Sequence, residues 1–339
     1  MIEKAKVDKI IKWGIIGCGD VTEVKSGPAY QQVAGFELSA VMRRDLEKAK
    51  DYAQRHGVPK YSNDADQLIN DPEIDAVYIA TPPDTHKYYA LKVAAAGKPC
   101  CIEKPMAPNH QECQNIVKVF EEKKLPLFVA YYRRTLPRFT QVKTWIDEGK
   151  IGEVRHIRWH YSKEPSEVDL SKSPNWRTDP LVAPGGYFDD LASHGLDLFV
   201  HLLGEIKQVA GMSLNQQGLY GAMDAFTASW LHVGGVTGSG SWNFGCASQE
   251  DRVEIYGSLG KIEFSIFDDQ PLVCRHKQGD EILNVPHPSS VQLHHVERMR
   301  DELFGGKAHP STGLSGAHTS WVMDQILNLS KLGGMPKAK

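Results

Sequence analysis

The feature that most constrains the fold is the rhythm of the first 130 residues. From Ile10 to about Ala130, short apolar runs alternate with longer stretches of helical periodicity. This alternation is typical of strand-helix-strand units, which build a parallel sheet with helices on its faces. The pattern predicts strands at residues 12–17, 36–42, 76–80, 99–102 and 127–130, and helices at 46–56, 64–70, 86–96 and 110–123. The first part of the chain is therefore predicted to be a doubly wound α/β domain.

The pattern changes after Pro137. A helix to Glu148 and the strand-like stretch "GEVRHIRWHYS" are followed by a polar loop, an apolar helix over about 186–203, and short strands separated by glycines to about 285. These features predict an α+β domain with an open, mostly antiparallel sheet that has one face covered. We place the boundary between residues 135 and 136, and expect a last helix at about 315–330 that could pack back on the first domain.

Composition limits the class of protein and of partner. A chain of 339 residues exceeds what one core usually serves, and 41% apolar with 24% charged residues is ordinary for a globular protein. The net charge of −3 supplies no field for nucleic acid or a membrane surface, so we expect a small-molecule partner. No apolar run is long enough for a signal core or a membrane span, and we expect a cytoplasmic protein with reduced cysteines.

The stretch "WGIIGCGDVT" ends the first predicted strand with two glycines. Gly17 and Gly19 allow a tight turn and a close approach of backbone amides to a pyrophosphate, while Thr22 stands where a third glycine is common. Two glycines in a turn are a weak signal alone, but the strand before them and the units after them favour dinucleotide binding. Asp20 and Val21, which follow, are included among the expected cofactor contacts.

The second strand ends in two arginines. In "SAVMRRDLEKA", Arg43 stands at the strand tip and Arg44 follows, whereas Asp45 lies further along and is expected to cap the next helix. A guanidinium suits the 2′-phosphate of NADP, and an acidic residue would suit the ribose hydroxyl of NAD. We therefore favour NADP; the alternative is that both arginines are solvated and NAD binds.

Two further strand ends carry polar residues. "YIATPPDTH" places Thr81, Pro82 and His86 near the cofactor, although an ordinary strand-to-helix turn explains the same letters. "GKPCCIEKPMAPN" places Glu103 and Lys104 directly after a buried strand, and we expect both to contact the cofactor. In open α/β sheets ligands bind outside the carboxyl ends of the strands, so Lys104 could reach the reactive end of a cofactor. The proline after it would stiffen the loop and the carboxylate before it could orient the ammonium.

The segment "GGYFDDLASHGLDLFVH" is a second candidate cluster. If it is one helix, Asp190, His194 and Asp197 fall at i, i+4 and i+7 and share a face. A carboxylate one turn from an imidazole can fix its tautomer and raise its basicity. A structural contact is the commoner meaning of such a pair seen alone. Metal ligation with His201 is a further alternative, which we rank low, and we expect no metal.

Five motifs together resemble a known family. "GCGDVT", "ATPPDTH", "AAAGKPCCIEKPMA", "VAYYRRTLP" and "GGYFDDLASHGLDL" stand in the order found in the glucose-fructose oxidoreductase and inositol dehydrogenase (GFO/IDH/MocA) family. The resemblance implies an N-terminal Rossmann domain and a C-terminal domain for substrate binding and oligomerisation, as a homodimer or homotetramer. It also implies that Lys104 is catalytic and that His194 accepts the proton, with Asp190 as its orienter and a substrate ligand.

Other polar and aromatic residues are candidates for the substrate pocket. Tyr132 and Arg134 follow the strand that ends at Ala130, and Trp176 with Arg177 precedes the glycine pair, where family members carry similar residues. Such side chains suit sugar rings, although the first stretch could equally be a solvated domain hinge. We count Asp190 and His194 among the substrate contacts as well.

The predicted function is hydride transfer between NADP or NAD and a secondary hydroxyl or keto group of a sugar or polyol. One alternative is a glycosidase that keeps NAD bound and oxidises its substrate transiently. Another is a nucleotide-sensing regulator without turnover, which would have no need of Lys104, Asp190 and His194 together.

Overall fold

The computed structural model describes residues 9–327, which form two compact units. The first comprises the described residues up to Ala107 together with Gln111–Leu136 and Pro288–Gly316. The second comprises Pro108–His110, Pro137–His287 and the described residues from Ala317. The division after Leu136 lies one residue from the expected boundary. The assignment of Pro288–Gly316 to the first unit is a difference, because a segment that returns from the far end of the chain leaves no local signal.

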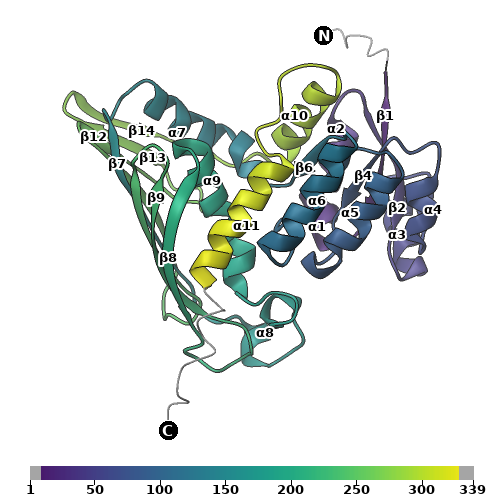
Figure 1. The fold of residues 1–339 in the computed structure, drawn as a ribbon, viewed down its shortest axis with the longest axis horizontal. Coiled ribbons are helices and arrows are strands. Elements are labelled where there is room, and N and C mark those ends of the chain that lie inside the picture. Colours follow the sequence, from purple (N-terminus) through teal and green to yellow (C-terminus); the bar gives the residue numbers. More distant parts are fainter. Residues whose placement is uncertain (1–8, 328–339) are drawn as a thin grey trace. The chain divides into compact units, whose positions relative to one another are not determined.

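The first unit is built on a six-stranded sheet in the order β3-β2-β1-β4-β5-β6. Strands β1, β2, β4 and β6 of this sheet are labelled in Figure 1. All of its neighbouring strands are parallel. This is the strand order of a dinucleotide-binding sheet, in which the order reverses between the first and fourth strands. The strands are β1 (Ile11–Ile16), β2 (Phe36–Met42), β3 (Lys60–Ser62), β4 (Ala76–Ile79), β5 (Cys100–Ile102) and β6 (Leu127–Val129).

The helices of this part of the chain connect consecutive strands. They are α1 (Asp20–Val24), α2 (Gly27–Gln32), α3 (Leu46–His56), α4 (Ala65–Asn70), α5 (His86–Ala95) and α6 (His110–Glu122), with 3₁₀ turns η1 (Pro83–Thr85) and η2 (Tyr132–Thr135). A later helix, α10 (Leu293–Leu303), also belongs to this unit. The predicted ranges agree with these elements to within two residues. β3, α1 and α2 were not predicted because they are too short to show a period.

Aromatic side chains fill the core under the first strands. Trp13 of β1 packs on Tyr30 of α2 with ring centroids 4.9 Å apart, and Tyr30 stacks on Tyr78 of β4 at 5.2 Å. All three are fully buried, and Val296 and Met299 of α10 join the same cluster. Each buried side chain of this size stabilises the fold by roughly 1.5–3 kcal/mol. The carboxyl ends of β1 and β4 are therefore held on a rigid base.

The second unit contains an eight-stranded sheet in the order β14-β13-β12-β11-β7-β10-β9-β8. Only β7 and β10 pair in parallel, and every other neighbouring pair in this sheet is antiparallel. The predicted fold class, a doubly wound parallel sheet plus a mostly antiparallel one, is confirmed. The strands are β7 (Val154–Ser162), β8 (Ile206–Leu214), β9 (Ala225–His232), β10 (Thr237–Asn243), β11 (Glu250–Gly257), β12 (Gly260–Phe264), β13 (Leu272–His276) and β14 (Gly279–Leu283).

One face of this sheet is covered by α9 (Ser193–Leu203). Phe199 meets Trp159 of β7 edge to face at 5.6 Å and stacks on Trp230 of β9 at 6.2 Å. Gly195 is required at this contact, because a Cβ atom there would lie 2.3 Å from the Trp159 ring. The other elements are α7 (Pro137–Asp147), α8 (Glu167–Leu170), η3 (Trp176–Thr178) and α11 (Gly313–Leu327), whose first four residues belong to the first unit.

The segment expected to be one helix over 186–203 is divided in two. A π-helical turn, η4, spans Phe188–Ala192, and α9 follows from Ser193. In a π turn the hydrogen bonds run from i to i+5, so α-helical spacing does not apply across it. The expectation that Asp190, His194 and Asp197 share one α-helical face therefore rested on an incorrect local structure. Of the expected last helix, residues 328–330 lie outside the described residues.

Among the helices of residues 9–327, none has the length and apolar character that crossing a membrane requires.

Candidate active site

The two glycines of the loop after β1 have different surroundings. Gly17 has φ +93°, and a Cβ atom there would lie 2.8 Å from Cγ2 of Thr81 and 2.9 Å from the carbonyl carbon of Ala80. A Cβ atom on Gly19 would meet only the Gly17 carbonyl oxygen, at 3.9 Å. Packing and the positive φ therefore require glycine at position 17. At position 19 the absence of a side chain leaves space through which a phosphate could approach.

Thr22 replaces the third glycine of the usual motif and ties the loop to α1. Its hydroxyl donates to the Gly19 carbonyl at 2.7 Å and accepts from the Gly19 amide at 3.0 Å. Asp20 and Val21 are the first two residues of α1, and the first amides of a helix have no intrahelical partner. The contact of Asp20 and Val21 with a cofactor remains a prediction.

The arginines after β2 lie beside this loop. Arg43 donates from Nη1 to the Cys18 carbonyl at 3.2 Å, so its guanidinium lies against the glycine loop. Asp45 caps α3, as predicted, and accepts from the Lys48 amide at 3.2 Å. Arg44 is exposed. The acidic side chain of Asp45 is thus engaged at the start of α3, whereas the cationic side chain of Arg43 lies against the glycine loop.

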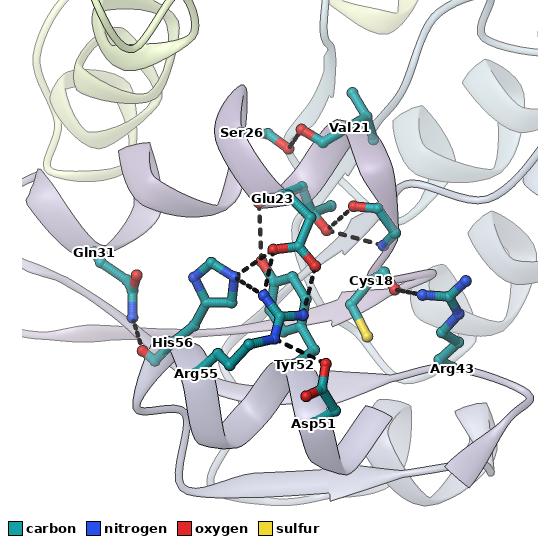
Figure 2. A network of polar contacts seen from close by, with 12 residues as sticks. Cys18, Val21, Glu23, Ser26, Gln31, Arg43, Asp51, Tyr52, Arg55 and His56 are labelled. Atoms are coloured by element: carbon teal, nitrogen blue, oxygen red, sulfur yellow. Dashed lines mark hydrogen bonds and ion pairs between the residues drawn. The ribbon is translucent and has the colours of Figure 1, made fainter. Parts of the chain in front are cut away.

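A polar network fastens α1 to the last turn of α3 (Figure 2). Arg55 grips the Glu23 carboxylate with both terminal nitrogens, each at 2.8 Å, and His56 Nε2 lies 2.7 Å from the same carboxylate. Arg55 also donates from Nε to Asp51 at 2.8 Å, and the buried Tyr52 hydroxyl donates to the Thr22 carbonyl at 2.9 Å. Ion pairs of this bidentate geometry position planar groups well. The network holds the helix that follows the glycine loop.

We expect this network to contribute stability that depends on pH. Hydrogen bonds from Arg55 lower the pKa of Glu23 from 4.5 to about 2. A carboxyl with a lowered folded pKa stabilises the fold above its unfolded pKa, and this stability is lost as pH falls from about 4.5 towards 2. E23Q should therefore unfold roughly 2 °C below the wild type at pH 7, with a smaller gap at pH 3, in thermal scans. An equal gap at both pH values would contradict this assignment.

The Glu-Lys-Pro turn begins directly after β5, at the carboxyl edge of the parallel sheet. Glu103 is buried, and its carboxylate accepts from the Tyr78 hydroxyl at 2.6 Å and from the backbone amide of Lys104 at 3.0 Å. The Lys104 side chain is half-buried, and its peptide bond to Pro105 is cis. These bonds tie the carboxylate to the main chain of the turn, and the expectation that Glu103 orients the ammonium remains a prediction.

His86 is a brace between two loops. Its imidazole is fully buried, with Nε2 2.7 Å from the Thr81 carbonyl oxygen and Nδ1 3.0 Å from the Pro105 carbonyl oxygen. Burial lowers its pKa, so the neutral ring is favoured. The Thr81 side chain meets the Thr85 hydroxyl at 2.8 Å, and Pro82 precedes η1. The assignment of Thr81, Pro82 and His86 to the cofactor remains a prediction.

The pocket candidates after β6 have structural partners in the first unit. Arg134 donates from Nη1 to the Pro310 carbonyl at 2.8 Å, and the Tyr132 hydroxyl accepts from Arg133 at 3.0 Å. Both Tyr132 and Arg134 are buried in η2, a tight turn rather than a solvated hinge. Their roles in substrate binding remain predictions.

The candidates of the second unit gather around Asp190. Arg177 donates from Nε to the Asp190 carboxylate at 2.6 Å, and its guanidinium lies 4.5 Å from the centre of the Trp176 ring. Trp176 and Arg177 were predicted as site residues from one stretch and Asp190 from another, and the structure brings the two stretches together. Tyr187, which the sequence did not single out, joins the same loop by donating to Asp169 at 2.8 Å and accepting from Asn175 at 3.1 Å.

His194 is buried in the first turn of α9. Its ring meets Phe267 nearly at a right angle, with centroids 6.1 Å apart. Phe267 is held by Asp251, whose carboxylate accepts from its amide at 2.7 Å. Asp197, further along the helix, accepts from the Thr319 hydroxyl at 3.0 Å. An aromatic wall beside the imidazole is a feature the sequence could not supply, because Phe267 lies in a loop without a motif.

A second carboxyl near this helix has an unusual environment. Asp189, next to Asp190, is buried and accepts from the Gly185 amide at 2.8 Å. Burial raises its pKa to about 7, and the charge of Asp324 adds to the rise. Among residues 9–327, no group of three or more His, Cys, Asp or Glu side chains is placed to hold a metal ion.

A parallel sheet in this strand order, with a glycine loop after its first strand, is the arrangement of dinucleotide-binding domains. The N-terminal domain described as "Oxidoreductase family, NAD-binding Rossmann fold" matches residues 11–131, and the GFO/IDH/MocA C-terminal domain matches residues 139–263. The chain belongs to the GFO/IDH/MocA oxidoreductase family. The predicted resemblance and the predicted class of enzyme are thereby confirmed.

Individual relatives agree with this placement. An oxidoreductase of Formosa agariphila is 35% identical over 315 residues, which is 93% of this chain and 97% of the relative. A levoglucosan dehydrogenase of Pseudarthrobacter phenanthrenivorans is 32% identical over 163 residues, 48% of this chain and 42% of the relative. A solved levoglucosan dehydrogenase with NADH and levoglucosan superposes with TM-score 0.83 at 23% identity, covering 96% of this chain and 98% of that one, and supports the fold.

Proposed function

We propose that this oxidoreductase transfers a hydride between a nicotinamide cofactor and a secondary hydroxyl or keto group of a sugar or polyol. The observation that carries the proposal is the Glu-Lys-Pro turn at the carboxyl end of β5, in a dinucleotide-binding sheet of a chain that belongs to this family. The similarity to levoglucosan dehydrogenase supports a carbohydrate as the substrate class.

In this proposal, different residues of the chain bind the cofactor, stabilise charge and transfer the proton. The cofactor, when bound, supplies the hydride chemistry, and Gly17, Gly19 and the first amides of α1 hold its pyrophosphate. The Lys104 ammonium stabilises negative charge on the reacting oxygen, and His194 accepts or returns the hydroxyl proton. Asp190, fixed by Arg177 at 2.6 Å, binds a neighbouring hydroxyl and orients His194.

A screen tests the function directly. Sugars, polyols and keto sugars would be offered with NADP(H) and with NAD(H), and absorbance at 340 nm would be followed. A net change in absorbance with at least one carbohydrate is expected. A glycosidase that regenerates its bound nicotinamide would release product without a net change, and a sensor would bind cofactor without turnover.

We further propose NADP as the preferred cofactor, with Arg43 as the group that binds its 2′-phosphate and Arg44 in support. Arg43 lies against the glycine loop, and Asp45 is engaged as the cap of α3. R43A should weaken NADPH binding by about 10-fold and leave NADH binding within about twofold, since a charged hydrogen bond contributes about 1.5–3 kcal/mol. Binding would be followed by nicotinamide fluorescence.

The control for this comparison is K48A, which removes a nearby exposed charge that pairs with Asp45. It should leave the ratio of the two dissociation constants unchanged. Tighter binding of NADH than of NADPH by the wild type would contradict the NADP assignment.

We also propose that the protein works in the cytoplasm as a homodimer or homotetramer, as the family resemblance implies. Light scattering coupled to size-exclusion chromatography measures the mass in solution. A mass of 37.8 kDa, that of a single chain, would contradict the proposed assembly.

A further inference from the structure

The carboxylate of Glu103 is held by a residue that lies 189 positions away in the chain. Gln292 donates from Nε2 to Glu103 Oε1 at 3.0 Å, and the Tyr78 hydroxyl donates to the same oxygen at 2.6 Å. The other oxygen, Oε2, accepts from the Lys104 amide at 3.0 Å. We refer to Tyr78, Glu103 and Gln292 as the clamp. Through Glu103, the clamp is thus bonded to the main chain of Lys104, the residue proposed to act on the reacting oxygen.

The two donors are themselves rigidly mounted. Tyr78 is fully buried in β4, and burial raises its pKa well above the usual value, so the phenol keeps its proton and donates. Gln292 immediately precedes α10, whose Val296 and Met299 lie in the core cluster with Tyr78. A carboxylate gripped from a central strand and from a helix start cannot shift without disturbing both elements.

The Gln292 side chain is costly to bury. It is 1% exposed, and among residues 9–327 its Oε1 has no hydrogen-bond partner. A buried polar atom without a partner lowers the free energy of unfolding. An apolar side chain of the same length would avoid this cost, but it would leave the buried Glu103 carboxylate with one donor fewer. The glutamine at this position is therefore explained by the hydrogen bond that it donates to Glu103.

The opposite side of the turn is held as well. His86 Nδ1 lies 3.0 Å from the Pro105 carbonyl oxygen and 3.3 Å from that of Met106. The turn is therefore braced before Lys104 by the clamp and after it by His86. The main chain on both sides of Lys104 is thus held by side chains of the first unit.

We infer that Gln292 and Tyr78 are positioning residues for Lys104, which act by holding the Glu103 carboxylate against the Lys104 main chain. This inference rests on the proposed role of Lys104. A misplacement of a reacting group by about 1 Å can cost roughly 100-fold in rate, whereas binding of the cofactor elsewhere on the sheet is unaffected. The clamp should therefore affect kcat and spare cofactor affinity.

The test uses Q292M, which keeps the length of the side chain and removes the donor, and Y78F, which removes one hydroxyl. Each is expected to lower kcat by about 10-fold, with the dissociation constant of NADPH within about twofold of the wild type. Hydrogen exchange of the ligand-free protein gives a second readout. The Lys104 amide should exchange at least about 10-fold faster in both variants, because its acceptor is no longer fixed.

S311A is the matched control. The buried Ser311 hydroxyl donates to the Val129 carbonyl at 2.7 Å on β6, the strand beside β5, and this bond involves none of the three clamp residues. It should lower the unfolding temperature about as much as Q292M does, with kcat and Lys104 exchange unchanged. A similar loss of kcat in S311A would mean that the loss follows stability, and would overturn the inference.

The other possible results also test the inference. If the Lys104 amide exchanges at the wild-type rate in Q292M and Y78F, the clamp does not hold the turn. If the amide exchanges faster but kcat is unchanged, the clamp does not position Lys104 for the reaction. If the wild type turns over no carbohydrate, the proposed function fails. The exchange measurement still decides whether the clamp holds the turn, because it needs neither cofactor nor substrate.

Discussion

H194A should lower kcat by about 100-fold or more while leaving NADPH affinity within about twofold. The reason is that His194 is proposed as the group that takes the hydroxyl proton, and removal of a general base typically costs 100- to 10,000-fold. Its imidazole is buried in α9 and lies edge-on to Phe267. Steady-state rates with the carbohydrate found in the screen, and fluorescence titration of NADPH, measure the two quantities.

The matched control is H201A, which removes the same ring from the same helix. His201 lies in the last turn of α9 and is half-buried, and the proposed mechanism gives it no part in the reaction. Its kcat should stay within about twofold of the wild type. Near-normal turnover by H194A would remove His194 from the mechanism.

K104M should lower kcat by roughly 100-fold or more, because it removes the charge that stabilises the reacting oxygen and keeps the length of the side chain. K104R should recover part of the rate, since it restores a positive charge with a different shape. Both variants would be measured beside the wild type at saturating cofactor.

K98M is the control for this series. Lys98 lies just before β5 and donates to the Asp71 carbonyl at 2.7 Å, so the change removes a partly buried ammonium from the opposite end of the same strand. A normal kcat is expected. If K104M retained more than about a third of the wild-type kcat, the role proposed for the Glu-Lys-Pro lysine would be wrong.

The parallel sheet could be predicted because its strands are buried on both faces. Residues 36–42 are buried except for Glu37, and residues 13–16 before Gly17 are all buried, so burial follows the mostly apolar sequence of both strands. The cap of α3 at Asp45 was predicted correctly for a similar reason, since an N-cap depends on the residues next to it. Both the sheet and the cap could be predicted because each depends on residues that are close together in the sequence.

The candidate site could be predicted only in part. The π turn at Phe188–Ala192 displaced the expected α-helical register of Asp190 and His194, and no residue type specifies such a turn. The ion pair between Arg177 and Asp190 joins two motifs that had been interpreted separately. His86 was expected near the cofactor, and its ring proved to be buried between backbone carbonyls.

The sequence by itself determined the class of this protein: a glycine loop after a buried strand, the Glu-Lys-Pro turn and an ordered set of family motifs. Tertiary structure alone decided how the turn is held, because Gln292 and Glu103 are 189 residues apart and meet only when α10 packs in the core of the first unit. The physical reason is that periodicity and turn chemistry act over a few residues. A hydrogen bond between distant side chains depends on the complete packing.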